Sequence, residues 1–139
     1  GRHDDVVNVS GHRISTVEVQ EAIKAHPAIA EAAAVGRPHE IKGQSIAAFV
    51  TLSGPSDDAD YLELDLRRMV SDFLGPYAAP SDIFVVSDLP RTHSGKLAKG
   101  YLMKLAALEH LQSIVDVSMI QNTNILAELE TEVLHRDKY

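Results

Sequence analysis

The stretch 91–104 is the part of the sequence best suited to chemistry on an anion. Its basic residues are Arg91, Lys96, Lys99 and Lys104. The stretch contains no aspartate or glutamate, although the whole chain has a formal net charge of −7. Lys96 follows the turn-forming pair Ser94–Gly95, and we expect a helix to begin at this junction, where backbone N–H groups favour negative charge. The pattern therefore predicts an anion site at Lys96, although a solvated basic helix start has the same composition.

The order Ser94-Gly95-Lys96 invites comparison with the phosphate-binding loop of nucleotide hydrolases. That loop needs a glycine, four residues, a second glycine, a lysine, and then serine or threonine. Here Pro90 occupies the position of the first glycine, and Leu97 follows the lysine. A loop of that class is therefore excluded.

The composition excludes several other classes of function. The chain has 139 residues, of which 45% are hydrophobic, so it has the length and composition of one globular domain. Its acidic balance argues against general binding of nucleic acid or anionic membrane, and no apolar run is long enough to span a bilayer. It contains no cysteine, which fits a reducing compartment, and we expect a cytoplasmic protein. Because the chain opens with Gly1 and charged residues, we expect it to be a piece of a longer protein.

The elements that must position Lys96 follow an α+β pattern. We expect a small mixed sheet of about three strands flanked by helices, plus a short N-terminal two-stranded hairpin that turns at Gly11. The expected sheet strands are 29–35, 45–52 and 83–86, with a polar, turn-rich link over 36–44. The predicted organisation is a hinge and hairpin over 1–14, a core over 15–108 and a tail over 109–139.

Helices are predicted from caps and from apolar spacing. Ser15 and Glu18 have the spacing of a capping box, and Pro27 ends the helix that follows. A second helix has apolar residues at Leu62, Leu66, Met69, Val70 and Phe73 and stops at Gly75–Pro76. A third runs through Leu97, Tyr101, Leu102, Leu105 and Leu108, and a last one covers about 125–134.

Two stretches match the motifs of one superfamily. Residues 89–96, Leu-Pro-Arg-Thr-His-Ser-Gly-Lys, resemble the last core motif of adenylate-forming enzymes, Leu-Pro-Lys-Thr-x-Ser-Gly-Lys. Residues 1–13 resemble the hinge motif of the same superfamily, which includes acyl-CoA synthetases, peptide-synthetase adenylation domains and luciferases. Residues 8–13, 32–44, 116–120 and 125–129 are similar to the acetyl-CoA synthetase branch. The chain therefore resembles the C-terminal domain of AMP-forming acetyl-CoA synthetases.

The resemblance implies a two-step ligation that this domain cannot perform alone. Acetate attacks the α-phosphate of ATP to give acetyl-AMP and pyrophosphate, and the CoA thiol then attacks the acetyl group and releases AMP. The C-terminal domain rotates between one pose for each step. Its implied partners are its own N-terminal domain, which holds most of the ATP and acetate pocket, and the substrates acetate, ATP and CoA.

The resemblance also implies roles in the adenylation step. Lys96 matches the catalytic lysine that bridges the acetate carboxylate and the α-phosphate. It also matches a modification site of a lysine acetyltransferase and a deacetylase. Asp4 matches the hinge on which the domain turns, and Arg2 and Arg13 match arginines that contact ATP, although a structural salt bridge is the competing role for each arginine.

Other positions are implied for CoA. Gly11 matches a glycine beside the pantetheine tunnel, and Ser10 matches a CoA contact. Many relatives carry an arginine for the CoA 3′-phosphate at the position of Ser71, and Arg67 or Arg68 is the candidate substitute here.

A magnesium site is a further implication. Backbone carbonyls at the end of the first helix hold Mg²⁺ in some relatives, and the matching positions are Lys24, His26 and Ile29. The last carbonyls of a helix lack helical partners, so a hard cation or water can bind there.

Two alternative functions remain at this point. A propionyl-CoA or other short-chain acyl-CoA synthetase domain would look the same, because the acyl pocket lies in the other domain. A non-catalytic interaction module that kept the fold is the second alternative, favoured by Ser71 and by Gly100, which replaces an arginine of the relatives.

Overall fold

The computed structural model describes residues 5–55, 59–107 and 117–137. Arg2 and Asp4 lie outside the described residues. The strands are β1 (Val6–Val9), β2 (His12–Ser15), β3 (Ile29–His39), β4 (Gly43–Leu52) and β5 (Asp82–Val85). The helices are α1 (Thr16–Lys24), α2 (Ala59–Leu74), α3 (Lys99–Ala107) and α4 (Leu126–Asp137), with short 3-10 turns η2 (Pro76–Ala78) and η3 (Thr123–Ile125).

The strands form one mixed sheet around β4. Antiparallel β3 pairs with β4 along its length, from Ile29 opposite Leu52 to His39 opposite Gly43. On the other side of β4, β5 pairs in parallel, and the β1–β2 hairpin joins where Val9 lies opposite Gly43. The expected α+β class is confirmed, and the hairpin proves to be continuous with the three-stranded sheet.

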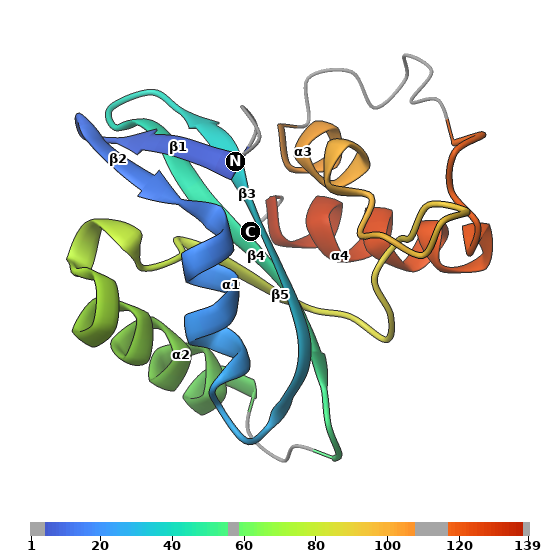
Figure 1. Ribbon diagram of the computed structural model, residues 1–139, viewed down its shortest axis with the longest axis horizontal. Helices are drawn as coiled ribbons and strands as arrows, with labels where there is room; N and C mark the ends of the chain where they lie inside the picture. Colours follow the sequence, from blue (N-terminus) through green and yellow to red (C-terminus); the bar gives the residue numbers. More distant parts are fainter. Residues whose placement is uncertain (1–4, 56–58, 108–116, 138–139) are drawn as a thin grey trace.

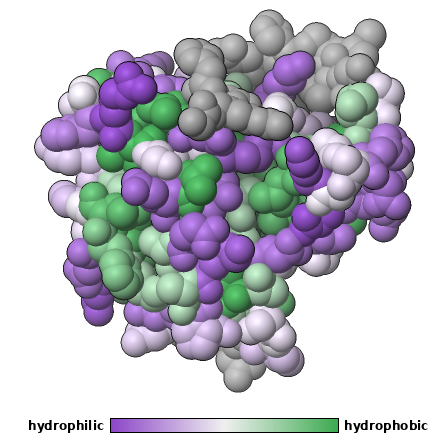
Figure 2. Space-filling view, viewed as in Figure 1, coloured by the Kyte–Doolittle hydropathy of each residue, from purple (hydrophilic) through white to green (hydrophobic). Residues whose placement is uncertain are grey.

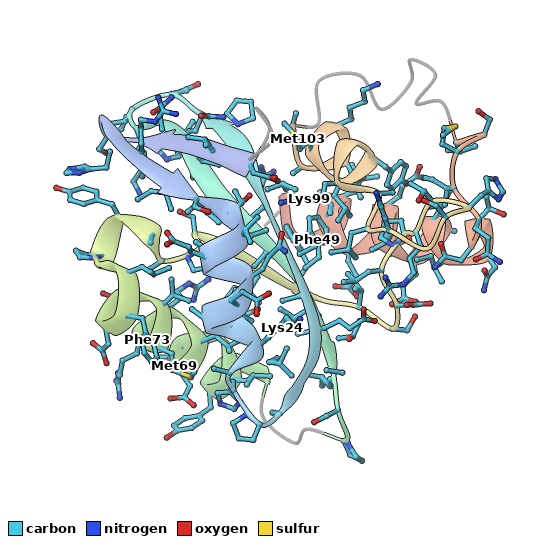
Figure 3. The ribbon with its side chains drawn as sticks, in the orientation of Figure 1. Lys24, Phe49, Met69, Phe73, Lys99 and Met103 are labelled. Atoms are coloured by element: carbon cyan, nitrogen blue, oxygen red, sulfur yellow. The ribbon has the colours of Figure 1, made fainter. Side chains whose placement is uncertain are left out.

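Helices cover both faces of this sheet, with α1 and α2 on one side and α3 and α4 on the other (Figure 1). Alternation along β3 and β4 supplies both cores, because successive side chains of a strand point to opposite faces. Ala33, Val35 and Phe49 pack with α3 and α4, and Figure 3 shows Phe49 on that side. Ala34 and Ala48 pack with α1 and α2.

A predicted cap explains where α1 begins, and a predicted glycine stop explains where α2 ends. The Ser15 side chain accepts a hydrogen bond from the Glu18 backbone N–H at 3.3 Å, as expected for an N-cap. At the end of α2, Gly75 adopts φ 98°, a conformation that glycine reaches without the strain of a Cβ.

Three sequence expectations are wrong in detail. The polar link after the first core strand is shorter than predicted, because β3 continues to His39 and Pro38 is tolerated in this edge strand. Phe73 falls in the last turn of α2 and is 70% exposed, so it is not part of the core face. Besides Phe73, further apolar residues lie at the surface over α1 and α2, where Figure 2 shows them mixed with hydrophilic residues. The third helix begins at Lys99, so Leu97 precedes it.

The tail contributes to the core that the α3 side of the sheet requires. Ile120, Ile125, Leu129 and Val133 belong to the same buried cluster as Phe49. The predicted division into 1–14, 15–108 and 109–139 stays a prediction. Among the residues that the structure describes, no helix has the length and apolar character needed to cross a membrane.

Candidate functional site

Lys96 lies on a short hairpin that precedes α3, not at the start of a helix as predicted. Arg91 and Leu97 form an antiparallel bridge, and the Thr92 N–H donates to the Lys96 carbonyl at 2.8 Å. The Gly95 N–H closes the turn on the Thr92 carbonyl at 2.9 Å, and Gly95 has φ 88°. Because the Ala98 N–H is bonded to the Pro90 carbonyl at 2.8 Å, the backbone is committed to the hairpin up to that point and α3 starts after it.

The hairpin presents Lys96 to solvent. The Lys96 side chain is exposed, and within the described part of the chain it has neither an ion pair nor a hydrogen bond. Arg91 instead turns back into the molecule, where it pairs with Glu31 of β3 and donates to the Gly95 carbonyl at 3.2 Å. Lys96 therefore carries the free charge of this hairpin, while Arg91 braces it.

Lys99 has a different environment from Lys96. Its ammonium donates to an Asp5 carboxylate oxygen and to the Thr16 hydroxyl, each at 2.9 Å. The Thr16 hydroxyl in turn donates to the Asp5 carbonyl at 3.1 Å. The Lys99 and Asp5 side chains are 15% and 19% exposed, and Figure 3 shows Lys99 between α3 and the start of α1. We call Asp5, Thr16 and Lys99 the clasp, because they join the residue that precedes β1 to α1 and α3.

Replacing Lys99 by alanine will destabilise the domain by about 2–3 kcal/mol, because a largely buried, hydrogen-bonded charge pair with Asp5 is lost. Urea unfolding of the wild-type and variant domains measures the difference. Lys104→Ala is the matched control, since Lys104 is an exposed lysine of the same helix. Equal destabilisation by both variants would contradict a stabilising clasp.

The candidate CoA residues lie at the turn of the β1–β2 hairpin. Ser10 has φ 51° and Gly11 has φ 85°, the pair of positive angles required by the favoured two-residue hairpin turn. The Ser10 N–H donates to the Lys42 carbonyl at 2.9 Å, which holds the turn against the β3–β4 connection. A Cβ added at Gly11 would meet nothing within 4 Å, so the space in front of this glycine is open.

Ser10 also lines a hollow of about 320 Å³ whose walls include Lys42 and Tyr77. A second hollow of about 590 Å³, lined by Arg37 and His39 among others, shares Ser45 and Ser81 with the first. The two form a groove with both polar and apolar walls beside the hairpin turn. At its rim the His12 and Tyr77 rings stack, with their centroids 3.8 Å apart.

The structure bears on the roles that the sequence leaves open for Arg13, Arg67 and Arg68. Arg13 is exposed on β2 and makes no ion pair among the described residues, so a buried structural salt bridge is not its role there. Arg67 is occupied, because it donates to the carbonyls of Pro80 at 2.9 Å and Ser81 at 3.1 Å. Arg68 is exposed, so of the two candidate substitutes for an arginine at Ser71 it is the available one.

The predicted magnesium carbonyls lie where α1 turns into β3. The His26 carbonyl accepts the Ile29 N–H at 3.1 Å, which leaves one of its lone pairs for a cation or water. The His26 ring is engaged: Nδ1 accepts the Ala28 N–H at 3.0 Å, so Nε2 carries the proton that faces Asp65 at 2.8 Å. Carbonyl oxygens together with water suit Mg²⁺, and the site stays a prediction for Lys24, His26 and Ile29. The described side chains contain no cluster of three or more His, Cys, Asp or Glu residues.

Tyr101 on α3 is buried, and its hydroxyl has no hydrogen-bond partner among the described residues. Burial, with a smaller effect of Glu130, raises the pKa of Tyr101 to about 12. The phenol therefore stays protonated near neutral pH and offers no base.

The structure does not bring the two groups of candidate residues together. The hairpin that carries Lys96 precedes α3 at the right of Figure 1, and the turn at Ser10 and Gly11 lies at the upper left, beyond the sheet. The domain thus carries its two groups of candidate residues at separate ends. A single pocket that faces the domain can contact only one of these ends at a time.

Comparison with known proteins assigns this architecture. The sequence model of the family described as AMP-binding enzyme C-terminal domain matches residues 18–96, more than half of the chain. An acetyl-coenzyme A synthetase of Alkalilimnicola ehrlichii is 46% identical over 129 residues, covering 93% of this chain and 20% of that protein. The human protein named acetyl-coenzyme A synthetase 2-like, mitochondrial, is 40% identical over 93% of this chain and 19% of its own length.

A solved structure agrees with these matches. The acyl-CoA synthetase of Brucella canis superposes with a TM-score of 0.70 at 38% identity, covering 75% of this chain and 19% of that one. The chain thus spans about one fifth of the length of the relatives it matches. It belongs to the family of AMP-binding enzyme C-terminal domains.

Proposed function

We propose that this chain is the mobile C-terminal domain of an AMP-forming acetate–CoA ligase. The observation that carries the proposal is the placement of Lys96 and Gly11 at separate ends of one domain whose sequence is 40–46% identical to proteins named acetyl-coenzyme A synthetase. A reaction with two half-steps at one pocket can use the two ends in turn. The proposed substrates are acetate, ATP and CoA, with Mg²⁺ accompanying the nucleotide.

In the first proposed pose, Lys96 enters the pocket of the N-terminal domain. Acetate oxygen attacks the α-phosphorus of ATP, and pyrophosphate leaves. Negative charge gathers on the carboxylate and phosphate oxygens, and an exposed lysine on a braced hairpin supplies a preorganised positive charge for it. Arg2 and Arg13 are proposed to contact ATP, and Asp4 is proposed to be the pivot between the poses.

In the second proposed pose, the Ser10–Gly11 turn faces the pocket. The CoA thiol attacks the acetyl carbonyl of acetyl-AMP, the bond to phosphate breaks, and AMP leaves. The open space in front of Gly11 supports passage of the narrow pantetheine arm, and the adjacent groove, which Ser10 and Lys42 line, supports contact between Ser10 and CoA.

The test is pyrophosphate release by the full-length protein with acetate, propionate and butyrate. We expect pyrophosphate release and CoA-dependent turnover by the full-length protein, with a preference for acetate. We expect no turnover by residues 1–139 alone, because most of the proposed pocket lies outside them. Acetyl-AMP formation by the isolated domain, or no acyl-dependent release by the full-length protein, would contradict the proposal.

The cysteine-free composition supports a reducing location, and we propose the cytoplasm.

Lys96 is also the proposed target of a lysine acetyltransferase and a deacetylase. It is exposed on its hairpin, whereas Lys99 is bonded within the clasp, so a modifying enzyme reaches Lys96 more readily. Acetylation removes the positive charge and adds bulk, so adenylation will fall about as far as in Lys96→Ala and a deacetylase will restore it. The measurement is both half-reactions of full-length protein carrying acetyl-lysine at position 96. Unchanged pyrophosphate exchange would eliminate both the switch and the catalytic role of Lys96.

A further inference from the structure

The tail is built into the loop that carries Lys96. Thr92 forms an antiparallel bridge with Ile120, and the Gln121 N–H donates to the Arg91 carbonyl at 2.8 Å. The His93 ring also lies 3.1 Å from the Ser118 carbonyl. The segment 118–122 therefore lies along the Lys96 hairpin and is hydrogen-bonded to it.

Asn122 holds the base of that hairpin from both sides of Pro90. Its side-chain oxygen accepts the Arg91 N–H at 2.8 Å, and its amide nitrogen donates to the Leu89 carbonyl at 2.8 Å. The same nitrogen lies 3.4 Å from a carboxylate oxygen of Asp88. Because proline has no N–H, this one amide pairs the polar groups that flank it and fixes the direction in which the hairpin leaves the core.

The tail segment around Asn122 is held in the core by other residues. Ile120 and Ile125 are 4% and 7% exposed in the core cluster, one on each side of Asn122 in the sequence. Loss of the Asn122 amide therefore leaves the tail docked and acts on the base of the hairpin. Among the described residues, the exposed Lys96 side chain has no hydrogen bond or ion pair of its own to restore its position.

We infer that Asn122 is a positioning residue for the adenylation step: it aims the Lys96 hairpin without touching substrate. The inference rests on the proposed function. A misplacement of about 1 Å at a reacting centre costs up to about 100-fold in rate, so a loosened hairpin base should lower kcat rather than nucleotide affinity.

The test uses the full-length protein with Asn122→Ala, Asn122→Asp and the control Asn124→Ala. Asp keeps the size and the acceptor for the Arg91 N–H but puts an oxygen against the Leu89 carbonyl. Asn124 is a nearby exposed asparagine whose side chain makes no hydrogen bond among the described residues. For both Asn122 variants we expect kcat of acetate-dependent ATP–pyrophosphate exchange to fall about 10- to 100-fold. The KM for ATP and the rate of thioester formation from supplied acetyl-AMP should change less than about twofold, and Asn124→Ala should match wild type.

The outcomes separate this inference from the proposed function. No exchange by the wild-type protein would overturn the proposed function itself. An active wild type with undiminished exchange in both Asn122 variants would overturn the inference. Loss of both half-reactions in equal proportion would also overturn it, because Asn122 would then only stabilise the fold. If Asn122→Ala does not fold, the same criteria apply to Asn122→Asp.

Discussion

Lys96→Ala in the full-length protein will lower acetate-dependent ATP–pyrophosphate exchange about 100- to 1000-fold. Removal of one preorganised group that stabilises transition-state charge costs about 3–4 kcal/mol. Thioester formation from supplied acetyl-AMP should survive, because we propose that in the second pose Lys96 has left the pocket.

The structure predicts that Lys96→Ala changes activity without a large loss of stability. The Lys96 side chain is exposed and makes no hydrogen bond or ion pair within the described residues, so its removal should change the unfolding free energy by no more than about 0.5 kcal/mol. Urea unfolding of the domain checks that expectation. Equal loss of both half-reactions would contradict the assignment of Lys96 to adenylation alone.

Gly11→Leu will have the opposite pattern, with thioester formation reduced about 100-fold or more and adenylation retained. A leucine side chain would enter the open space in front of the β1–β2 turn, where we propose that the pantetheine arm passes, and hold the thiol away from the acetyl carbon. Single-turnover conversion of acetyl-AMP and CoA to acetyl-CoA measures this step.

Gly11→Ala separates bulk from backbone strain. At φ 85° both substitutions pay the left-handed backbone cost of about 1–2 kcal/mol, but only leucine fills the space. We expect the alanine variant to keep much more of the thioester step. Similar losses in the two variants would mean that strain in the turn, not obstruction, is the cause.

Cap and turn signals between neighbouring residues were enough to predict the elements near the Ser10–Gly11 turn. The Ser15 cap, the turn at Gly11 and the stop at Gly75 each depend on residues adjacent in the chain, and all three are confirmed. The exposure of Lys96 also follows from its place beside a Ser–Gly turn. Their roles in ATP and CoA chemistry stay predictions.

Features that depend on distant partners were not predictable in this way. Lys99 looked like part of a basic patch, yet its partner Asp5 lies 94 residues earlier in the chain. Asn122 has no periodic or motif signal, and the Arg91 N–H that its side chain accepts lies 31 residues away in the sequence. The sequence pattern predicts a helix start at Lys96, and this is wrong. Apolar spacing gives no sign of the hydrogen bond between the Ala98 N–H and the Pro90 carbonyl, which keeps the backbone out of α3 until Lys99.

The order in which the two faces of the sheet are covered has a consequence for synthesis on the ribosome. Val35 of β3 and Val133 of α4 belong to one buried cluster. At about 5–20 residues per second, roughly 5–20 s separate the synthesis of these two residues. During that interval β3 and β4 can pair and dock α1 and α2, while the face that contains Phe49 has no cover from α4. The nascent chain thus passes through a half-covered sheet, the kind of intermediate on which holding chaperones act and from which aggregation begins.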